Sequence, residues 1–276
     1  MNVVAEKLQR RMSQANSLLC VGLDPEIGRV PERFLGEAPQ QRFGEWIIDE
    51  TAQFSAAVKL NVAFYEARGA RGLAEMERTM GYVRQRYPDL VTICDAKRAD
   101  IGNTNKGYVE AIFDGMGFDA VTLHPYLGRE ALEPFLERRD KMCIVLCRTS
   151  NPGAAEFQDL HVDGRPLWLA VAENVSRTWD VEGNCALVVG ATYPEEMRRI
   201  RAAAPSTTFL VPGIGAQGGS VQAVIDAGAD AQSRGLLISA SRSILFSDHP
   251  AGAARELRDE INSALAAKKE RSDVAR

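Results

Sequence analysis

The chain has 276 residues, of which 45% are hydrophobic and 25% are charged, so it can bury a large core. Its formal net charge is −4, and no basic stretch is interleaved with aromatic residues, which argues against a nucleic-acid-binding protein. No apolar run reaches transmembrane length, and the charged, helix-like segment Met1–Gln14 lacks the apolar core of a signal peptide. We therefore expect a cytoplasmic protein that does not contact membranes, with its five cysteines reduced and buried.

Short apolar runs typical of strands alternate with amphipathic, helix-like stretches along the whole chain. The eight predicted strands are Leu18–Leu23, Ala56–Leu60, Leu90–Cys94, Ala120–Leu123, Cys143–Cys147, Ala186–Val189, Thr208–Val211 and Gly235–Ser239. The predicted helices are Met1–Gln14, Gln41–Phe54, Ala70–Arg86, Lys106–Asp114, Arg129–Leu136, Pro166–Trp179, Pro194–Ala203, Gly219–Ala227 and Ala251–Ala267.

Eight βα units predict a parallel (β/α)8 TIM barrel with an extra N-terminal helix, and the chain length is normal for one such domain spanning residues 1–276. A doubly wound open sheet is the alternative, but the first turn reads Gly22-Leu23-Asp24-Pro25 where that fold is expected to carry Gly-x-Gly-x-x-Gly. We expect residues 268–276 to be a frayed tail. Two long connections, Asp24–Gln40 and Arg148–Arg165, follow strands and should lie on the carboxyl-end face, where barrel active sites form.

The string Asp95-Ala96-Lys97-Arg98-Ala99-Asp100-Ile101-Gly102-Asn103 follows the third predicted strand. Alternate strand residues share a face, so Asp95 and Lys97 should point the same way, with Asp100 in the loop beyond. A lysine between two carboxylates is expected to remain an ammonium ion. Such a lysine is suited to giving a proton to carbon or to stabilising developing negative charge. Lys59 ends the neighbouring predicted strand, and a purely structural ion network is the alternative for these four residues.

Polar residues follow most of the other predicted strands and should converge on one mouth. The loop after the seventh strand, Pro212–Gly219, is rich in glycine, so backbone N–H groups could approach an anion closely. Arg242 follows the eighth strand at the start of a helical turn, where unpaired N–H groups also favour an anion. Barrels usually hold phosphate at this position, so the pattern predicts a phosphorylated small-molecule substrate. The alternative is that the glycines only form a turn and Arg242 only pairs on the surface.

From about Leu18 to Leu245 the chain resembles the orotidine 5′-phosphate decarboxylase family, in the longer-chain bacterial subgroup. The charged string matches the signature Asp-x-Lys-x-x-Asp-Ile of that family, which is highly specific. Other matching blocks follow in the right order: Val58–Asn61, Thr149–Gly153, Pro212–Gly219 and Ser241–Ile244. The resemblance implies a (β/α)8 barrel that forms a homodimer with shared active sites. It also implies decarboxylation of orotidine 5′-phosphate to uridine 5′-phosphate, a step of de novo pyrimidine biosynthesis, without metal or organic cofactor.

The resemblance further implies a role for each matching residue. Lys97 would protonate C6 of the pyrimidine, Asp95 would lie beside the departing carboxylate, and Lys59 would complete the charged network and bond the ribose. Asp100 and Thr104 would come from the partner subunit. The remaining substrate contacts would be Asp24 on the ribose, Ser150 on the pyrimidine, Gln217 between pyrimidine and phosphate, and Ser241 and Arg242 on the phosphate.

Two alternatives share these features. A related barrel family decarboxylates or condenses sugar phosphates, uses Mg²⁺ to stabilise an enediolate, and resembles this chain in the Asp-x-Lys-x-x-Asp stretch. A non-catalytic phosphate-ligand sensor on a barrel scaffold is the other alternative. The Ser150 block and Gln217 favour a pyrimidine nucleotide over a sugar phosphate, and the complete charged set favours an enzyme over a sensor.

Overall fold

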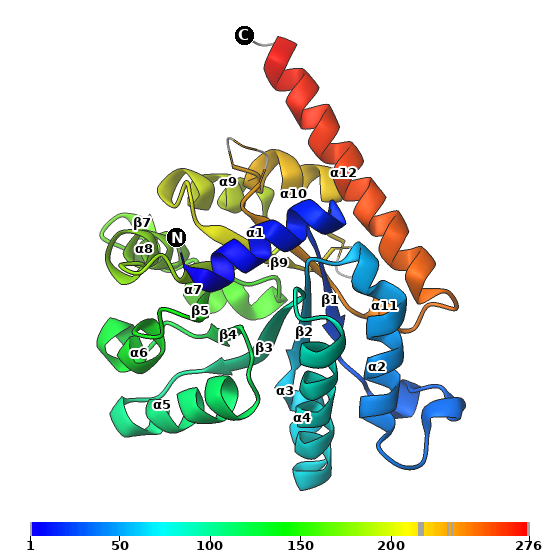
Figure 1. Cartoon of the computed structure of the whole chain (residues 1–276). Helices are drawn as coiled ribbons and strands as arrows, with labels where there is room; N and C mark the ends of the chain where they lie inside the picture. The colour runs from blue at the N-terminus through cyan, green and yellow to red at the C-terminus, as the bar shows by residue number, and fades with distance from the viewer. Residues whose placement is uncertain (1, 215–217, 231, 233, 275–276) are drawn as a thin grey trace.

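The computed structural model describes residues 2–214, 218–230, 232 and 234–274. Eight parallel strands close into a barrel in which each strand pairs with its neighbour along the chain and β10 pairs back to β1 (Figure 1). All eight predicted strands are confirmed, and closure excludes the open doubly wound sheet. The strands are β1 (Leu19–Leu23), β2 (Ala57–Asn61), β3 (Val91–Arg98), β4 (Ala120–Leu123), β5 (Met142–Arg148), β8 (Cys185–Val189), β9 (Thr208–Pro212) and β10 (Leu236–Ala240).

Helices surround the barrel and pack their apolar stripes onto the outer faces of the strands. On α4, for example, Met76, Met80 and Val83 recur at helical spacing and are completely buried. The helices are α1 (Val3–Ala15), α2 (Pro39–Thr51), α3 (Val62–Glu66), α4 (Gly69–Arg86), α5 (Gly102–Val109), α6 (Gly128–Leu136), α7 (Ala155–Gln158), α8 (Leu167–Asn174), α9 (Pro194–Ala203), α10 (Val221–Gly228), α11 (Arg242–Leu245) and α12 (Pro250–Val274). Shorter helical segments are η1 (Ile27–Arg29), η2 (Glu32–Phe34), η3 (Ala52–Phe54), η4 (Glu110–Gly115), η5 (Pro152–Ala154) and η6 (Val175–Trp179).

The predicted N-terminal helix, α1, lies across the barrel (Figure 1). Its buried residues Val4 and Leu8 pack with the side chains that fill the amino-terminal half of the barrel interior. Lys7 forms an ion pair with Asp119 at 2.8 Å, and Arg11 donates to the Ser55 carbonyl at 3.0 Å. Because α1 covers the amino-terminal end, the opposite, carboxyl-terminal end is the open one.

Helix α12 runs to Val274, although we expected fraying from residue 268. Lys268 Nζ donates to the carbonyls of Ile225 and Ala229 near the end of α10, and Arg271 pairs with Asp226 at 2.5 Å. Lys268 thus meets carbonyls at the C-terminus of α10, where positive charge is favourable, and Arg271 meets a carboxylate on the last turn of the same helix. The charges at the end of α12 thus bind it to α10.

Two further findings bear on the sequence analysis. The five cysteines are unpaired and buried, as predicted, and burial raises the pKa of the Cys20 and Cys143 thiols to about 12. None of the helices in the described ranges combines the length and apolar character that a membrane crossing requires.

Candidate active site

A cavity of about 340 Å³ lies at the carboxyl ends of the barrel strands. It is lined by ends of five strands and by the segments that follow them, including Asp24 after β1, Lys59 on β2, Asp95 on β3 and Ser241 and Arg242 after β10. The remaining lining residues described are Glu26, Asn61, Phe64, Pro212, Gly213, Ile214, Ser239, Ala240, Ser243 and Phe246. The fold thus brings five of the predicted site residues to one cavity, from four parts of the chain.

A buried carboxylate between two lysines is the central feature of this site. Asp95 Oδ2 accepts from Lys59 Nζ at 2.8 Å, and Asp95 Oδ1 accepts from Lys97 Nζ at 2.6 Å. The side chains of Lys59 and Asp95 are 7% and 10% exposed, whereas that of Lys97 is 49% exposed. Lys59 is therefore fixed inside the protein, and Lys97 is the lysine that a substrate could reach.

The electrostatics keep this network ionised. Burial alone would raise the pKa of Asp95, but the neighbouring ammonium groups of Lys59 and Lys97 hold it well below its usual range. Burial alone would lower the pKa of Lys59, but Asp95 and Asp24 raise it above its usual range. Near neutral pH, Asp95 therefore carries a negative charge and Lys59 a positive one.

Lys97 contacts Asp95 from an irregular part of β3. The regular alternation of side chains along the strand, assumed from the sequence, is wrong at this point. The pairing of β3 with β4 changes register between Cys94 and Arg98, and Lys97 has a positive φ of 48°. A β-bulge of this kind re-aims side chains and is common beside active sites. Few non-glycine residues adopt positive φ, so this backbone must be held in place by its surroundings.

Thr122 on β4 is a neighbour of the charged network that the sequence analysis missed. Its Oγ1 donates to Asp95 Oδ1 at 2.8 Å and accepts from the Lys97 N–H at 3.0 Å. Thr122 is 1% exposed. A threonine within an apolar strand is an ordinary feature, so its contact could be recognised only once the register of β3 and β4 was known.

Asp100 and Thr104 lie apart from the cavity. The Asp100 side chain accepts from the Ile101 N–H at 2.6 Å, and the Asp100 N–H donates to buried Asn105 at 2.9 Å. Thr104 is exposed in the first turn of α5. Within the described residues, Lys97 has an ion pair with Asp95 but none with Asp100. A single chain therefore does not assemble the complete predicted charged set.

At the end of the cavity formed by the segment after β10, Ser241 packs closely against Gly22 on β1. A Cβ atom at position 22 would lie 1.9 Å from Ser241 Oγ, so the close approach requires glycine. Arg242 begins α11 and is exposed at the cavity. The Asp24 Oδ1 atom is buried and has no hydrogen-bond partner among the described residues, which leaves it available to a hydroxyl donor. Gln217, predicted to contact the substrate, lies outside the described residues.

Ser150 lies on the long connection after β5 and packs against Gly190, where a Cβ atom would come within 2.9 Å of the Ser150 Cβ. Gln158 on α7 holds the preceding residue, because it accepts from the Thr149 N–H at 2.9 Å and donates to the Thr149 hydroxyl at 2.8 Å. Arg148 is 1% exposed, donates to Gln158 Oε1 at 3.3 Å and lies 3.8 Å from the centre of the Tyr193 ring. The connection also contains a hairpin, β6 (His161–Val162) with β7 (Arg165–Pro166), that the sequence analysis did not predict.

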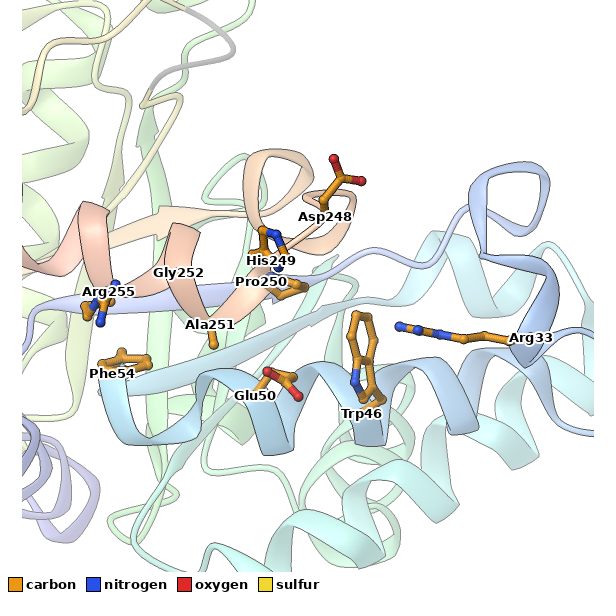
Figure 2. Close-up of a pocket in the computed structure, with 10 residues that line it drawn as sticks. All are labelled: Arg33, Trp46, Glu50, Phe54, Asp248, His249, Pro250, Ala251, Gly252 and Arg255. Atoms are coloured by element: carbon orange, nitrogen blue, oxygen red, sulfur yellow. The ribbon is translucent and has the colours of Figure 1, made fainter.

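A second cavity, of about 550 Å³, opens between α2 and the start of α12 (Figure 2). Arg33 extends over the Trp46 ring there, at 4.4 Å from the ring centre, and His249 and Arg255 line the opposite side. Among the residues that the structure describes, none of the predicted site residues lines it. The charged network and the converging strand ends therefore identify the smaller cavity as the candidate active site.

Comparison with known proteins identifies the family. A family model described as "Orotidine 5′-phosphate decarboxylase / HUMPS family" matches residues 17–257. A curated orotidine 5′-phosphate decarboxylase from Roseiflexus castenholzii is 45% identical over 271 residues, which cover 95% of this chain and 98% of that protein. Another, from Cellvibrio japonicus, is 44% identical over 271 residues, with coverage of 95% and 98%.

A solved structure of Leishmania donovani OMP decarboxylase superposes with a TM-score of 0.87 at 40% identity, and the match covers 96% of this chain and 99% of that one. Together with the curated relatives and the family model, this structure confirms the resemblance inferred from the sequence. The chain therefore belongs to the orotidine 5′-phosphate decarboxylase / HUMPS family.

Proposed function

We propose that this protein is a carboxy-lyase that converts orotidine 5′-phosphate to uridine 5′-phosphate and carbon dioxide in pyrimidine biosynthesis. The observation that carries the proposal is the half-exposed Lys97 ammonium, held 2.6 Å from a buried carboxylate at the barrel mouth. This arrangement is found in a chain that is 45% identical to a curated orotidine 5′-phosphate decarboxylase. The match covers nearly the whole length of both proteins. The expected cytoplasmic location stays a prediction.

Lys97 has the position and the charge to act on C6 of the pyrimidine. When the bond between C6 and the carboxylate breaks, its electron pair stays on C6 and carbon dioxide leaves. The Lys97 ammonium then gives its proton to C6 and becomes a neutral amine. A fixed cation beside the carbon where negative charge develops is a preorganised electrostatic partner, and such partners are usually the largest source of rate enhancement.

Asp95 and Lys59 support this step from inside the barrel. Both charges of the pair are fixed by burial and by their 2.8 Å contact, so neither has to reorganise during the reaction. In the proposed complex, Asp95 lies near the substrate carboxylate, where two negative charges repel each other until carbon dioxide leaves. Lys59, linked to Asp95, completes the network and bonds the ribose.

The other predicted residues would bind the substrate remote from the bond that breaks. Asp24, with its free acceptor atom, suits a ribose hydroxyl. Arg242 and the adjacent Ser241, which line the cavity, would hold the phosphate. Ser150 would bond the pyrimidine, and Gln217 would contact both the pyrimidine and the phosphate. Binding energy from the phosphate could position the ring over Lys97 and exclude water.

We further propose that two chains form a homodimer in which each supplies Asp100 and Thr104 to the active site of the other. Two observations support this arrangement. Asp100 is not paired with Lys97 within the described part of one chain, and the surrounding edge exposes two large hydrophobic side chains, Ile101 at 61% and Tyr126 at 90%. The connections that carry Ile101 and Tyr126 are neighbours, because the His124 N–H donates to the Arg98 carbonyl. An apolar edge beside unused site residues is typical of a subunit interface.

The test is the loss of orotidine 5′-phosphate absorbance with purified protein, with and without EDTA. Turnover that is insensitive to EDTA and abolished by Lys97→Ala would support the proposal and the absence of a metal requirement. Turnover lost on chelation would favour the Mg²⁺-dependent sugar-phosphate chemistry of related barrels. Tight binding of uridine 5′-phosphate without turnover, by folded protein, would instead favour a sensor.

A further inference from the structure

We propose that Thr122 is a positioning residue that holds Asp95 and Lys97 in their reactive arrangement. The inference rests on the proposed decarboxylase function, because it concerns the same charged network. Thr122 is buried on β4 and is not among the residues that line the cavity, so it acts through its two neighbours.

Thr122 supports the irregular backbone at Lys97. At the bulge, β3 and β4 lose their regular register between Cys94 and Arg98, and φ of Lys97 becomes 48°. The Lys97 N–H is donated to a side chain, Thr122 Oγ1, at 3.0 Å. Because this N–H faces a side chain that is 1% exposed, leaving it unpaired would be costly, and the Thr122 oxygen stabilises the irregular backbone.

Thr122 also orients the carboxylate of Asp95. A hydroxyl carries one hydrogen, and that of Thr122 points to Asp95 Oδ1 at 2.8 Å. The same oxygen accepts from Lys97 Nζ at 2.6 Å. A charge-assisted hydrogen bond of this kind is stronger than a neutral one and fixes the plane of the carboxylate. The Thr122 side chain therefore fixes the backbone of Lys97 and also the carboxylate that accepts a hydrogen bond from the Lys97 ammonium.

Valine has nearly the shape of threonine but can neither accept from the Lys97 N–H nor donate to Asp95. Serine keeps both functions of the hydroxyl and lacks only the methyl group. Thr122→Val should therefore remove both hydrogen bonds, so that the Lys97 backbone and the Asp95 carboxylate can both shift. Thr122→Ser should keep both hydrogen bonds and most of the arrangement.

The chain offers a matched control at the closed end of the barrel. Thr92 Oγ1 donates to Asp119 Oδ2 at 3.0 Å and accepts from the Asp119 N–H at 3.0 Å, so it plays the same double role for a carboxylate. Thr92 is also buried, at 3% exposure, but lies near the amino end of β3. Thr92→Val should thus lower stability as Thr122→Val does, without disturbing the site.

The experiment compares kcat, KM and Tm for the three variants and the wild-type protein on orotidine 5′-phosphate. Loss of a hydrogen bond to a charged group should lower kcat of Thr122→Val about 10- to 100-fold, with KM changed less than about threefold. Thr122→Ser should recover kcat to within about threefold of wild type, and Thr92→Val should keep it within about twofold. Equal kcat for Thr122→Val and Thr92→Val, at similar losses in Tm, would overturn the proposal.

A crystal structure of Thr122→Val separates this inference from the function on which it rests. If wild-type protein shows no turnover, the decarboxylase proposal fails, but the positioning role is still decided by the positions of Asp95 and Lys97. A changed φ at Lys97 or a rotated Asp95 carboxylate supports the role. An unchanged network in Thr122→Val refutes it whatever the activity.

Discussion

Replacement of Lys59 by methionine tests whether the buried ion pair stabilises the fold as well as the site. At 2.8 Å, an effective dielectric constant of about 20 gives an attraction of about 6 kcal/mol between Lys59 and Asp95, most of it offset by the desolvation of both groups. Removing one partner of a buried pair typically costs about 3–5 kcal/mol, because the other charge is left uncompensated. Asp95 would keep its hydrogen bonds from Lys97 and Thr122, so we expect a loss of free energy of unfolding at the low end of this range, about 3 kcal/mol.

For 276 residues the entropy of unfolding is about 0.6 kcal/mol per kelvin, so this loss corresponds to a Tm lower by about 5 °C. Thermal or urea unfolding at fixed protein concentration would measure it. The matched control is Lys7→Met, which breaks a lysine–aspartate pair of the same 2.8 Å length at the closed end of the barrel. Lys7 and Asp119 are 22% and 17% exposed, and Asp119 keeps its bonds to Thr92, so about 1 kcal/mol and unchanged activity are expected.

The pH dependence gives the decisive comparison. The folded-state pKa of Asp95 is depressed in the wild type, so its contribution to stability is present above the unfolded value of about 3.9 and is lost as pH falls below that value. Without Lys59, the pKa of Asp95 rises relative to the wild type, because one of the two ammonium groups that oppose burial is gone. The difference in free energy of unfolding between wild type and Lys59→Met should therefore be largest near pH 7 and should decrease below about pH 4. A deficit that stays constant from pH 7 to pH 3.5 would refute the electrostatic account.

Two further predictions concern activity. Arg242→Ala should lower kcat/KM at least ~100-fold, or ~2.7 kcal/mol, because it removes a charge-assisted phosphate contact used in the transition state. A decrease of less than about threefold in folded protein would contradict that role. Mixing inactive Lys97→Ala with inactive Asp100→Ala should restore part of the activity, because one site of each hybrid dimer would contain both wild-type residues. No recovery, with subunit exchange demonstrated by mass spectrometry, would argue against a shared site.

The sequence was sufficient to predict the barrel because each strand is a short apolar run that is buried on both faces. Such a run can be recognised from the local sequence, without knowing which strands pair with it. It was also sufficient to place Asp24, Lys59, Asp95 and Arg242 at one cavity, since the carboxyl ends of parallel strands meet at one end of a barrel. The eight strands and their order around the barrel follow directly from these two regularities.

What the sequence did not predict depends on contacts between distant segments. The bulge at Lys97 arises from a register shift against β4, and the double role of Thr122 follows from that shift. The packing of Ser150 against Gly190 joins two connections that are 40 positions apart in sequence. Neither strand periodicity nor local motifs encode such contacts, which is why Thr122 and Gln158 were missed.

Because Lys97 occupies a left-handed backbone conformation, the two substitutions that remove its ammonium group should differ in stability. Alanine at φ 48° meets the same Cβ penalty as lysine, about 1–2 kcal/mol, whereas glycine adopts this conformation without it. Both variants should be inactive, but Lys97→Gly should unfold at a Tm about 2–3 °C above that of Lys97→Ala. The order should reverse at exposed Lys106 within α5, where glycine costs about 1 kcal/mol relative to alanine. If Lys97→Ala proves as stable as Lys97→Gly while the Lys106 pair behaves as expected, the backbone at position 97 is unstrained.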